Sequence, residues 1–329
     1  MTLRQFRAQA LTGAVAVVLA AGGLLLLGTD IRKSFSATLA GCVAAGCNPD
    51  AIADFTGRYD AIVTVAGVLL MAVPGLCGIF WGAPLVGAEL AAGTHRLAWT
   101  QSVGRSRWLT VKLLVVATAT AVVTGTLAAL LRWSVARYDL VEADRFAPMV
   151  FGARGIVPVA CAVFAFALGT AAGALLRRPV PAMAVTLAGF AALQFLVPLA
   201  LRPHFAPPVT GTIALDSAAV RNADSIRTTG DDRLLITGVS LPNAWVLDAT
   251  EVVDARGEPP SPAVLDACIT PDRFRTTLTC FAQRDLHVTA TYQPADRFWP
   301  FQLAESGLYL ALAGLLVWSC YRQVRRAAA

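Results

Sequence analysis

Lysine is scarce in this chain: among 329 residues, only Lys33 and Lys112 occur. The phosphate-binding loop of many ATPases needs a lysine in the pattern Gly-x-x-x-x-Gly-Lys-Ser/Thr, and neither lysine completes it. Gly-x-Ser-x-Gly and His-Glu-x-x-His patterns are also absent, and the three histidines are scattered. We therefore expect no ATPase site, cofactor site, metal site or enzymatic activity in this chain.

Charge is also scarce, at 15% of residues, whereas 56% are hydrophobic. A helix needs about 20 apolar residues to cross a bilayer core of about 30 Å. Six runs meet this length: Ala10 to Leu27, Ala61 to Val86, Val111 to Leu131, Gly155 to Leu176, Val180 to Leu201 and Leu303 to Cys320. The first run resembles a secretory signal, but we favour an uncleaved anchor because it is long and no clear small-x-small site follows it directly. The pattern predicts an all-α polytopic membrane protein with six transmembrane helices.

The charges outside the apolar runs predict an orientation. If the amino terminus is cytoplasmic, the cytoplasmic pieces hold eleven bases against one acid, Glu89. The bases are Arg4, Arg7, Arg96, Arg105, Arg107, Lys112, Arg177, Arg178, Arg322, Arg325 and Arg326. Positive charge is retained on the cytoplasmic side, so both termini are expected there. A pI near 9.2 then reflects bases that face anionic lipid, and we expect no nucleic-acid partner.

About 100 residues separate the fifth and sixth runs, which is too long for an ordinary connection. We expect residues 1–201 to form five transmembrane helices, residues 202–300 a large β-rich or mixed α/β extracytoplasmic domain, and residues 301–329 the sixth helix with a basic tail. Two local disulfides, Cys42 with Cys47 and Cys268 with Cys280, would suit an oxidising exterior. Other pairings and four free thiols stay open.

The connection between the second and third runs, residues 84–110, carries the most informative pattern. Glu89 follows an apolar stretch, and Gly93 with Thr94 can end its helix before a second short one. Arg96, Leu97 and Trp99 then form a mixed basic and apolar face, suited to the membrane interface or to a partner. The anchors of this interface are expected to be Trp99, Trp108 and Lys112.

This segment resembles the coupling helix of the permease subunits of type-2 ATP-binding-cassette (ABC) exporters. The family pattern is an acidic residue, Gly-Thr, an apolar turn, an Arg, and a Lys that opens the third span. The matching positions here are Glu89, Gly93, Thr94, Leu97, Arg105 and Lys112. The words GTHRLAWTQSV, RSRW and YQPADRFWPFQLAES resemble an actinobacterial branch. Ala88 and Val103 depart from the basic residue and the proline that many members have there.

The resemblance implies a permease that pairs with itself or a similar permease and with two copies of an ATP-binding subunit, which would bind ATP and Mg. Its coupling residues would be Glu89, Gly93, Thr94, Arg96, Leu97 and Arg105. Glu89 would contact the ATPase; its alternatives are pairing with Arg96 or simple hydration. The nearly charge-free spans favour a lipophilic or amphiphilic substrate.

Glu305 lies at the outer end of the sixth run, and Gln302 lies just before that run. Both could line an exit path, although a carboxylate in a first helical turn is also simply stabilised by the helix dipole. The alternative function is a stand-alone membrane sensor or membrane-bound enzyme that acts through its extracytoplasmic domain.

Overall fold

The computed structural model describes most of the chain: residues 2–42, 47–92, 105–142, 144–215, 225–228, 234–239, 241, 243–269 and 274–326. The chain divides into two compact units. The helical unit comprises Met1–Glu142, Pro148–Arg202 and Phe301–Ala329, and the sheet unit comprises Ala143–Ala147 and Pro203–Pro300.

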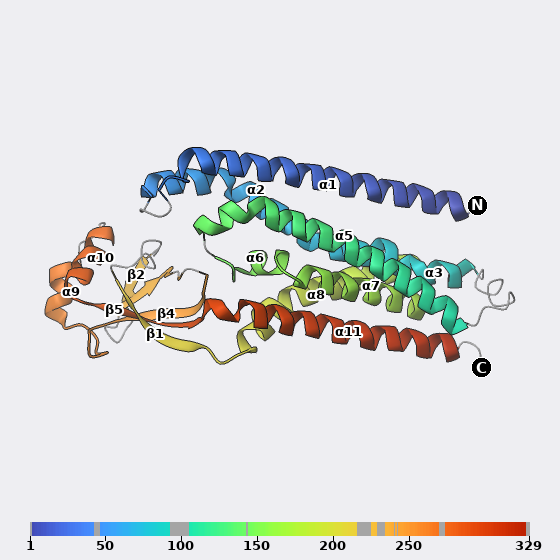
Figure 1. Cartoon of the computed structure of the whole chain (residues 1–329). Coiled ribbons are helices and arrows are strands. Elements are labelled where there is room, and N and C mark those ends of the chain that lie inside the picture. The colour runs from blue at the N-terminus through green and yellow to red at the C-terminus, as the bar shows by residue number, and fades with distance from the viewer. Residues whose placement is uncertain are drawn as a thin grey trace. The chain divides into compact units, whose positions relative to one another are not determined.

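The helices account for most of the chain. Apart from the helices beside the sheet, the described helices are α1 (Thr2–Thr38), α2 (Pro49–Cys77), η1 (Gly78–Gly82), α3 (Ala83–Ala92), α5 (Arg105–Glu142), α6 (Pro148–Ala153), α7 (Val157–Leu176), α8 (Pro179–Leu196), η2 (Val197–Leu201), η3 (Arg202–His204), η5 (Ala295–Arg297) and α11 (Phe298–Arg326). Pro74 lies within α2, and η1 and η2 are π-helical turns that continue α2 and α8. Figure 1 shows the long helices running beside one another.

Within the described residues, six helices are long and apolar enough to cross a membrane. Their bounds are Leu11–Thr38, Asp50–Ala88, Arg107–Glu142, Val157–Leu176, Pro179–His204 and Ala295–Gln323. These are the six predicted spans, but most extend beyond the apolar runs. α7 is the most buried of them and packs against α2, α3, α5 and α8, whereas α1 is the most exposed.

A core of apolar side chains fixes α1 to α2 and α5. Phe35 of α1 packs edge-on against Phe55 of α2, with ring centroids 6.0 Å apart. Phe55 in turn lies 5.3 Å from Tyr59, and Leu131 and Val135 of α5 join the same cluster. These side chains recur every three or four residues, the spacing of one helix face, so each helix presents an apolar stripe to its neighbours.

The sheet unit contains, in its described part, a sheet in the order β1-β5-β4-β3-β2 with antiparallel neighbours. The strands are β1 (Val209–Ala214), β2 (Ser225–Thr228), β3 (Leu234–Thr237), β4 (Trp245–Val253) and β5 (His287–Gln293). Alternate residues of β5, Val288 and Ala290, are buried in a core that also holds Phe281 of α10 (Phe274–Gln283) and Val264 of α9 (Pro262–Cys268). The region predicted to be β-rich or mixed is therefore a mixed α/β unit.

The cysteines pair locally, as the sequence favours. Cys42 bonds to Cys47, and Cys268, at the end of α9, bonds to Cys280 of α10. The other cysteines, Cys77, Cys161 and Cys320, are buried free thiols in the helical unit. The second disulfide joins the two helices that cover the sheet core, because Cys268 is part of that core and Cys280 packs against it.

Candidate functional site

The helix that carries Glu89 continues the second span. α2, η1 and α3 follow one another without a gap, and Glu89 lies in the last turn of α3. Five predicted coupling or anchoring residues, Gly93, Thr94, Arg96, Leu97 and Trp99, lie outside the described residues. Arg105 is the first residue of α5. The backbone therefore places Glu89 and Arg105 at the two ends of the segment proposed to form the coupling surface.

Glycines bring η1 and α3 into direct backbone contact with α7. A Cβ on Gly169 would lie 2.2 Å from the carbonyl oxygen of Gly78, and one on Gly173 would lie 2.3 Å from that of Ala83. In the other direction, a Cβ on Gly82 would lie 2.7 Å from the carbonyl oxygen of Phe166. Backbone atoms cannot yield as a flexible side chain can, so these positions accept only glycine.

An apolar cluster extends this contact to α5 and α11. Leu85 and Val86 of α3 are buried together with Leu109 of α5, Phe166 of α7 and Cys320 of α11. Close by, the hydroxyls of Thr110 and Tyr321 lie 2.6 Å apart and share a hydrogen bond. A displacement of α3 would therefore act on α5, α7 and α11 at once.

The predicted anchors of the third span take part in this packing. Trp108 is half-buried against the apolar cluster, and the Lys112 ammonium lies 4.4 Å from the centre of its ring. A similar pair occurs in α11, where the Arg322 guanidinium lies 4.0 Å from the ring of Trp318. Such cation–π pairs suit the interface between lipid and water, where the ring is apolar and the charge is hydrated.

A model of the family described as ABC-2 membrane transporter related matches residues 14–202. The match extends from α1 to Arg202, so it includes five of the six spans and the whole packing of α3 on α7. This chain belongs to the ABC-2 membrane transporter related family. Comparison with curated proteins gives no match, and comparison with solved structures gives none either. The family and the six apolar helices together make the chain a multi-pass membrane protein and the permease component of a transporter, a component that generally associates with an ABC ATP-binding subunit.

In this ABC-2 family member, the two residues considered for an exit path lie in a buried polar cluster. The Arg202 guanidinium donates from Nε to Oε2 of Glu305 at 2.9 Å and from Nη2 to Oε1 at 3.1 Å. Its planar group also lies 4.1 Å from the centre of the Phe151 ring. Both charged side chains are almost completely buried. Glu305 is therefore an ion-pair partner as well as a residue of the first turns of α11; an exit-path role stays a prediction.

Gln302 completes the cluster and links α11 to the start of α7. Its Oε1 accepts hydrogen bonds from the backbone N–H groups of Ile156 and Val157, both at 3.1 Å. Its Nε2 donates to the carbonyl oxygens of Phe151 at 3.0 Å and Arg154 at 3.2 Å. One side chain thus satisfies backbone groups where α6 ends and α7 begins, groups that are costly to leave unpaired inside a membrane protein.

A second polar contact lies one turn further along α11. The Tyr309 hydroxyl donates to Oε1 of Gln194 on α8 at 3.4 Å, and the Cys161 thiol of α7 approaches the same oxygen at 3.8 Å. Neither Arg202 nor Tyr309 was predicted from the sequence. A base that directly follows the fifth apolar run and an acid near the start of the sixth were the available signal for the ion pair.

Proposed function

We propose that this chain is the permease subunit of an ATP-driven exporter in which α3 receives the motion of a separate ATP-binding subunit. Family membership supports the transporter class, and the backbone contact between α3 and α7 supports the mechanism. That contact is the observation on which the proposal rests. At Gly169 and Gly173, the backbone of α7 meets that of η1 and α3 with no side chain between them.

The proposed cycle follows from this packing. Two ATP-binding subunits hold ATP and Mg and close on two permeases, either two copies of this chain or this chain and a similar one. Their closure pushes on the segment around Glu89, where a lone carboxylate among bases would meet a basic partner surface. Since α3 cannot slide independently of α7, the push rotates α7 and the spans clustered with it. The spans then alternate between inward-open and outward-open arrangements.

The orientation and substrate are further parts of the proposal. The bias of bases toward one side supports both termini in the cytoplasm and the sheet unit outside. The sequence words that resemble an actinobacterial branch support the plasma membrane of an actinobacterium as the location. The two disulfides suit an oxidising exterior. Spans with few charged residues support a lipophilic or amphiphilic cargo rather than a small hydrophilic ion.

The test is co-purification and transport with the ATP-binding subunit encoded beside this chain. We expect wild type to co-purify with it, and Glu89→Ala to weaken the complex and abolish ATP-dependent transport while membrane insertion stays normal. Asp54→Asn is the matched control, because Asp54 is an exposed carboxylate of the same helical unit with no role in the proposed contact. Function without any ATPase, together with tolerance of Glu89→Ala, would instead favour a sensor or enzyme that acts through the sheet unit.

A further inference from the structure

A basic cavity of about 620 Å³ lies between α1 and α5, away from α3 and from the buried ion pair. Its lining combines three bases with apolar and small groups: Arg32, Lys33, Phe35, Ser36, Ala40, Arg137 and Leu140. No carboxylate lines it among the described residues. The cavity is therefore a concentration of positive charge at the end of two candidate spans.

Three of the carboxylates near this end of the bundle bind other donors. Asp30 accepts the Tyr59 hydroxyl at 2.7 Å, and Asp60 accepts the Tyr138 hydroxyl at 3.1 Å. Asp139 accepts Arg154 through both of its oxygens, at 3.1 Å each. In the described part of the chain, none of these acids lies within 4.0 Å of a cavity base. Among the described residues, no carboxylate forms an ion pair with any of the three cavity bases.

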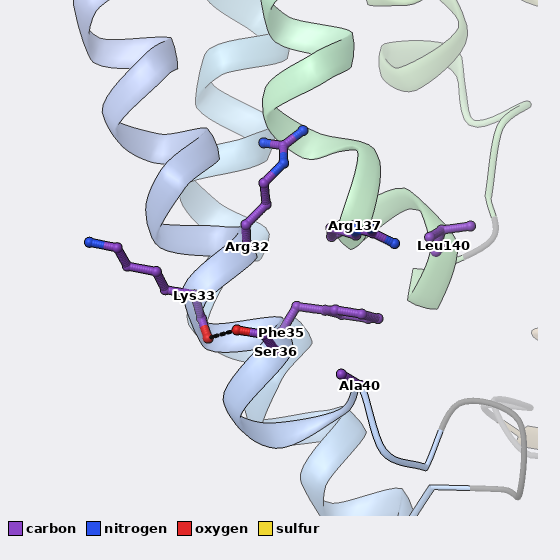
Figure 2. A pocket seen from close by; sticks show the side chains of 7 residues that line it. All are labelled: Arg32, Lys33, Phe35, Ser36, Ala40, Arg137 and Leu140. Atoms are coloured by element: carbon purple, nitrogen blue, oxygen red, sulfur yellow. Dashed lines mark hydrogen bonds between the residues drawn. The ribbon is translucent and has the colours of Figure 1, made fainter.

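The two arginines are held toward the space between the helices. Arg32 donates to the carbonyl oxygens of Gly28 and Trp133, and its guanidinium lies 3.8 Å from the centre of the Trp133 ring. These bonds use only two of its five N–H groups. The exposed Arg137 guanidinium lies 5.4 Å from the ring of Phe35. Figure 2 shows the Lys33 ammonium pointing away from both arginines, so Arg32 and Arg137 are the bases that reach across from one helix to the other.

The surroundings favour an anion with an apolar tail. Phe35 and Leu140 line the cavity beside the bases. Exposed apolar side chains continue along both helices, among them Leu26 of α1 and Val122 of α5. On the cytoplasmic side of membranes, basic pockets between transmembrane helices bind the headgroups of anionic lipids. The same chemistry applies at this end of the bundle, because an arginine fork suits phosphate oxygens on either side.

From this geometry we infer that the cavity between α1 and α5 binds the phosphate headgroup of an anionic amphiphile through Arg137 and Arg32, with the acyl chains lying against the exposed faces of the two helices. The inference does not depend on the proposed export function. It assigns the cavity to a membrane lipid, and a soluble phosphate that binds equally well would contradict it.

Native mass spectrometry of the full chain in detergent tests this assignment. The protein is mixed with equal amounts of phosphatidylglycerol and phosphatidylcholine of the same chain length, and the retained lipid is counted. We expect wild type to retain phosphatidylglycerol, and Arg137→Gln to reduce its retention about fivefold, the effect of removing one arginine from an anionic lipid surface. Soluble glycerol phosphate should neither be retained nor displace the lipid.

Two further variants decide the outcome. Arg132→Gln removes an exposed base from the same helix that does not line the cavity, and it should leave retention unchanged. Ala40→Trp keeps every charge but fills part of the cavity, and it should release the lipid. Equal effects of the two arginine changes would show general charge attraction and overturn the inference. Retention in Ala40→Trp with loss in Arg137→Gln would place the anion outside the cavity and also overturn it.

Discussion

Arg202 and Glu305 form a bidentate ion pair with no more than 2% of either side chain exposed. The pair joins the end of the fifth span to the start of the sixth, across 103 residues of sequence. Nη1 of Arg202 is buried without a hydrogen-bond partner in the described structure. Glu305 and the ring of Phe151 therefore provide the main interactions that replace the lost hydration of the Arg202 guanidinium. Such a pair positions two spans strongly, but it adds little net stability because both charges had to leave water.

Removing one partner of this pair should therefore lower the stability of the protein strongly. We expect Glu305→Gln to destabilise the protein by about 3–5 kcal/mol, since it leaves a buried guanidinium without a counter-charge. The double variant Arg202→Met with Glu305→Leu should recover most of that loss. Thermal unfolding in detergent, followed by the fraction that stays monodisperse, measures both, with Asp54→Asn as the exposed control. A single variant as stable as wild type would refute the argument.

The spans could be predicted from sequence, but their ends could not. The first apolar run stops at Leu27, whereas α1 continues to Thr38. The extension contains charged residues, and it is helical because Ile31 and Phe35 lie one turn apart and pack on Phe55 and Tyr59. Hydropathy averages over all faces of a helix, so it ends the span where charges begin, although one face stays apolar.

Contacts between segments that are distant in the sequence could not be predicted from the sequence. Gly169 and Gly173 pack against the segment from Gly78 to Ala83 of the same chain, and the spacing of glycines on one helix does not identify the helix that it meets. The link between Arg202 and Glu305 likewise depends on which spans are neighbours. The coupling residues from Gly93 to Trp99 lie outside the described part, so their role stays a prediction.

The disulfide between Cys268 and Cys280 should stabilise the sheet unit. It closes a loop of 12 residues, which corresponds to about 3 kcal/mol from the lost freedom of the unfolded chain. Replacing both cysteines by alanine should speed proteolysis of this unit on the order of a hundredfold when cleavage follows opening. The bond between Cys42 and Cys47 spans only 5 residues, so its removal should speed proteolysis of the helical unit by a smaller factor. Equal factors for the two bonds would argue against loop closure as the cause of the stabilisation.

Asp254 gives the sheet unit a specific dependence on pH. Its Oδ1 accepts the backbone N–H groups of Arg256 at 2.8 Å and Glu258 at 2.9 Å, in the turn after β4. These bonds favour the ionised carboxylate and lower the pKa of Asp254. Its contribution to stability is therefore present above the unfolded pKa, and it is lost as the pH falls through the lower folded pKa.

The variant Asp254→Asn isolates this contribution. Its melting temperature should lie slightly below that of wild type at pH 7, and the difference should shrink once the pH falls below about 4. Thermal unfolding at a series of pH values provides the measurement. A difference that persists unchanged into acid would mean that the charge of Asp254 does not support the turn.

Gly173→Ala tests the contact between α3 and α7 most directly. The added methyl would lie 2.3 Å from the carbonyl oxygen of Ala83, so the two helices must separate. We expect a loss of about 1–3 kcal/mol, the usual cost of overpacking a tight interior. Gly314→Ala on α11 is the matched control, because nothing lies within 4 Å of its added methyl and alanine favours a helix more than glycine does.

The same pair of variants separates coupling from assembly. If α3 transmits the motion of the ATP-binding subunit through α7, Gly173→Ala should still co-purify with that subunit, since Glu89 is unchanged, yet it should transport poorly at a temperature where it remains folded. Gly314→Ala should behave as wild type in both assays. Full transport by Gly173→Ala would mean that α3 passes the motion to the spans by another contact, the most direct being the apolar cluster of Leu85 and Val86 with α5 and α11.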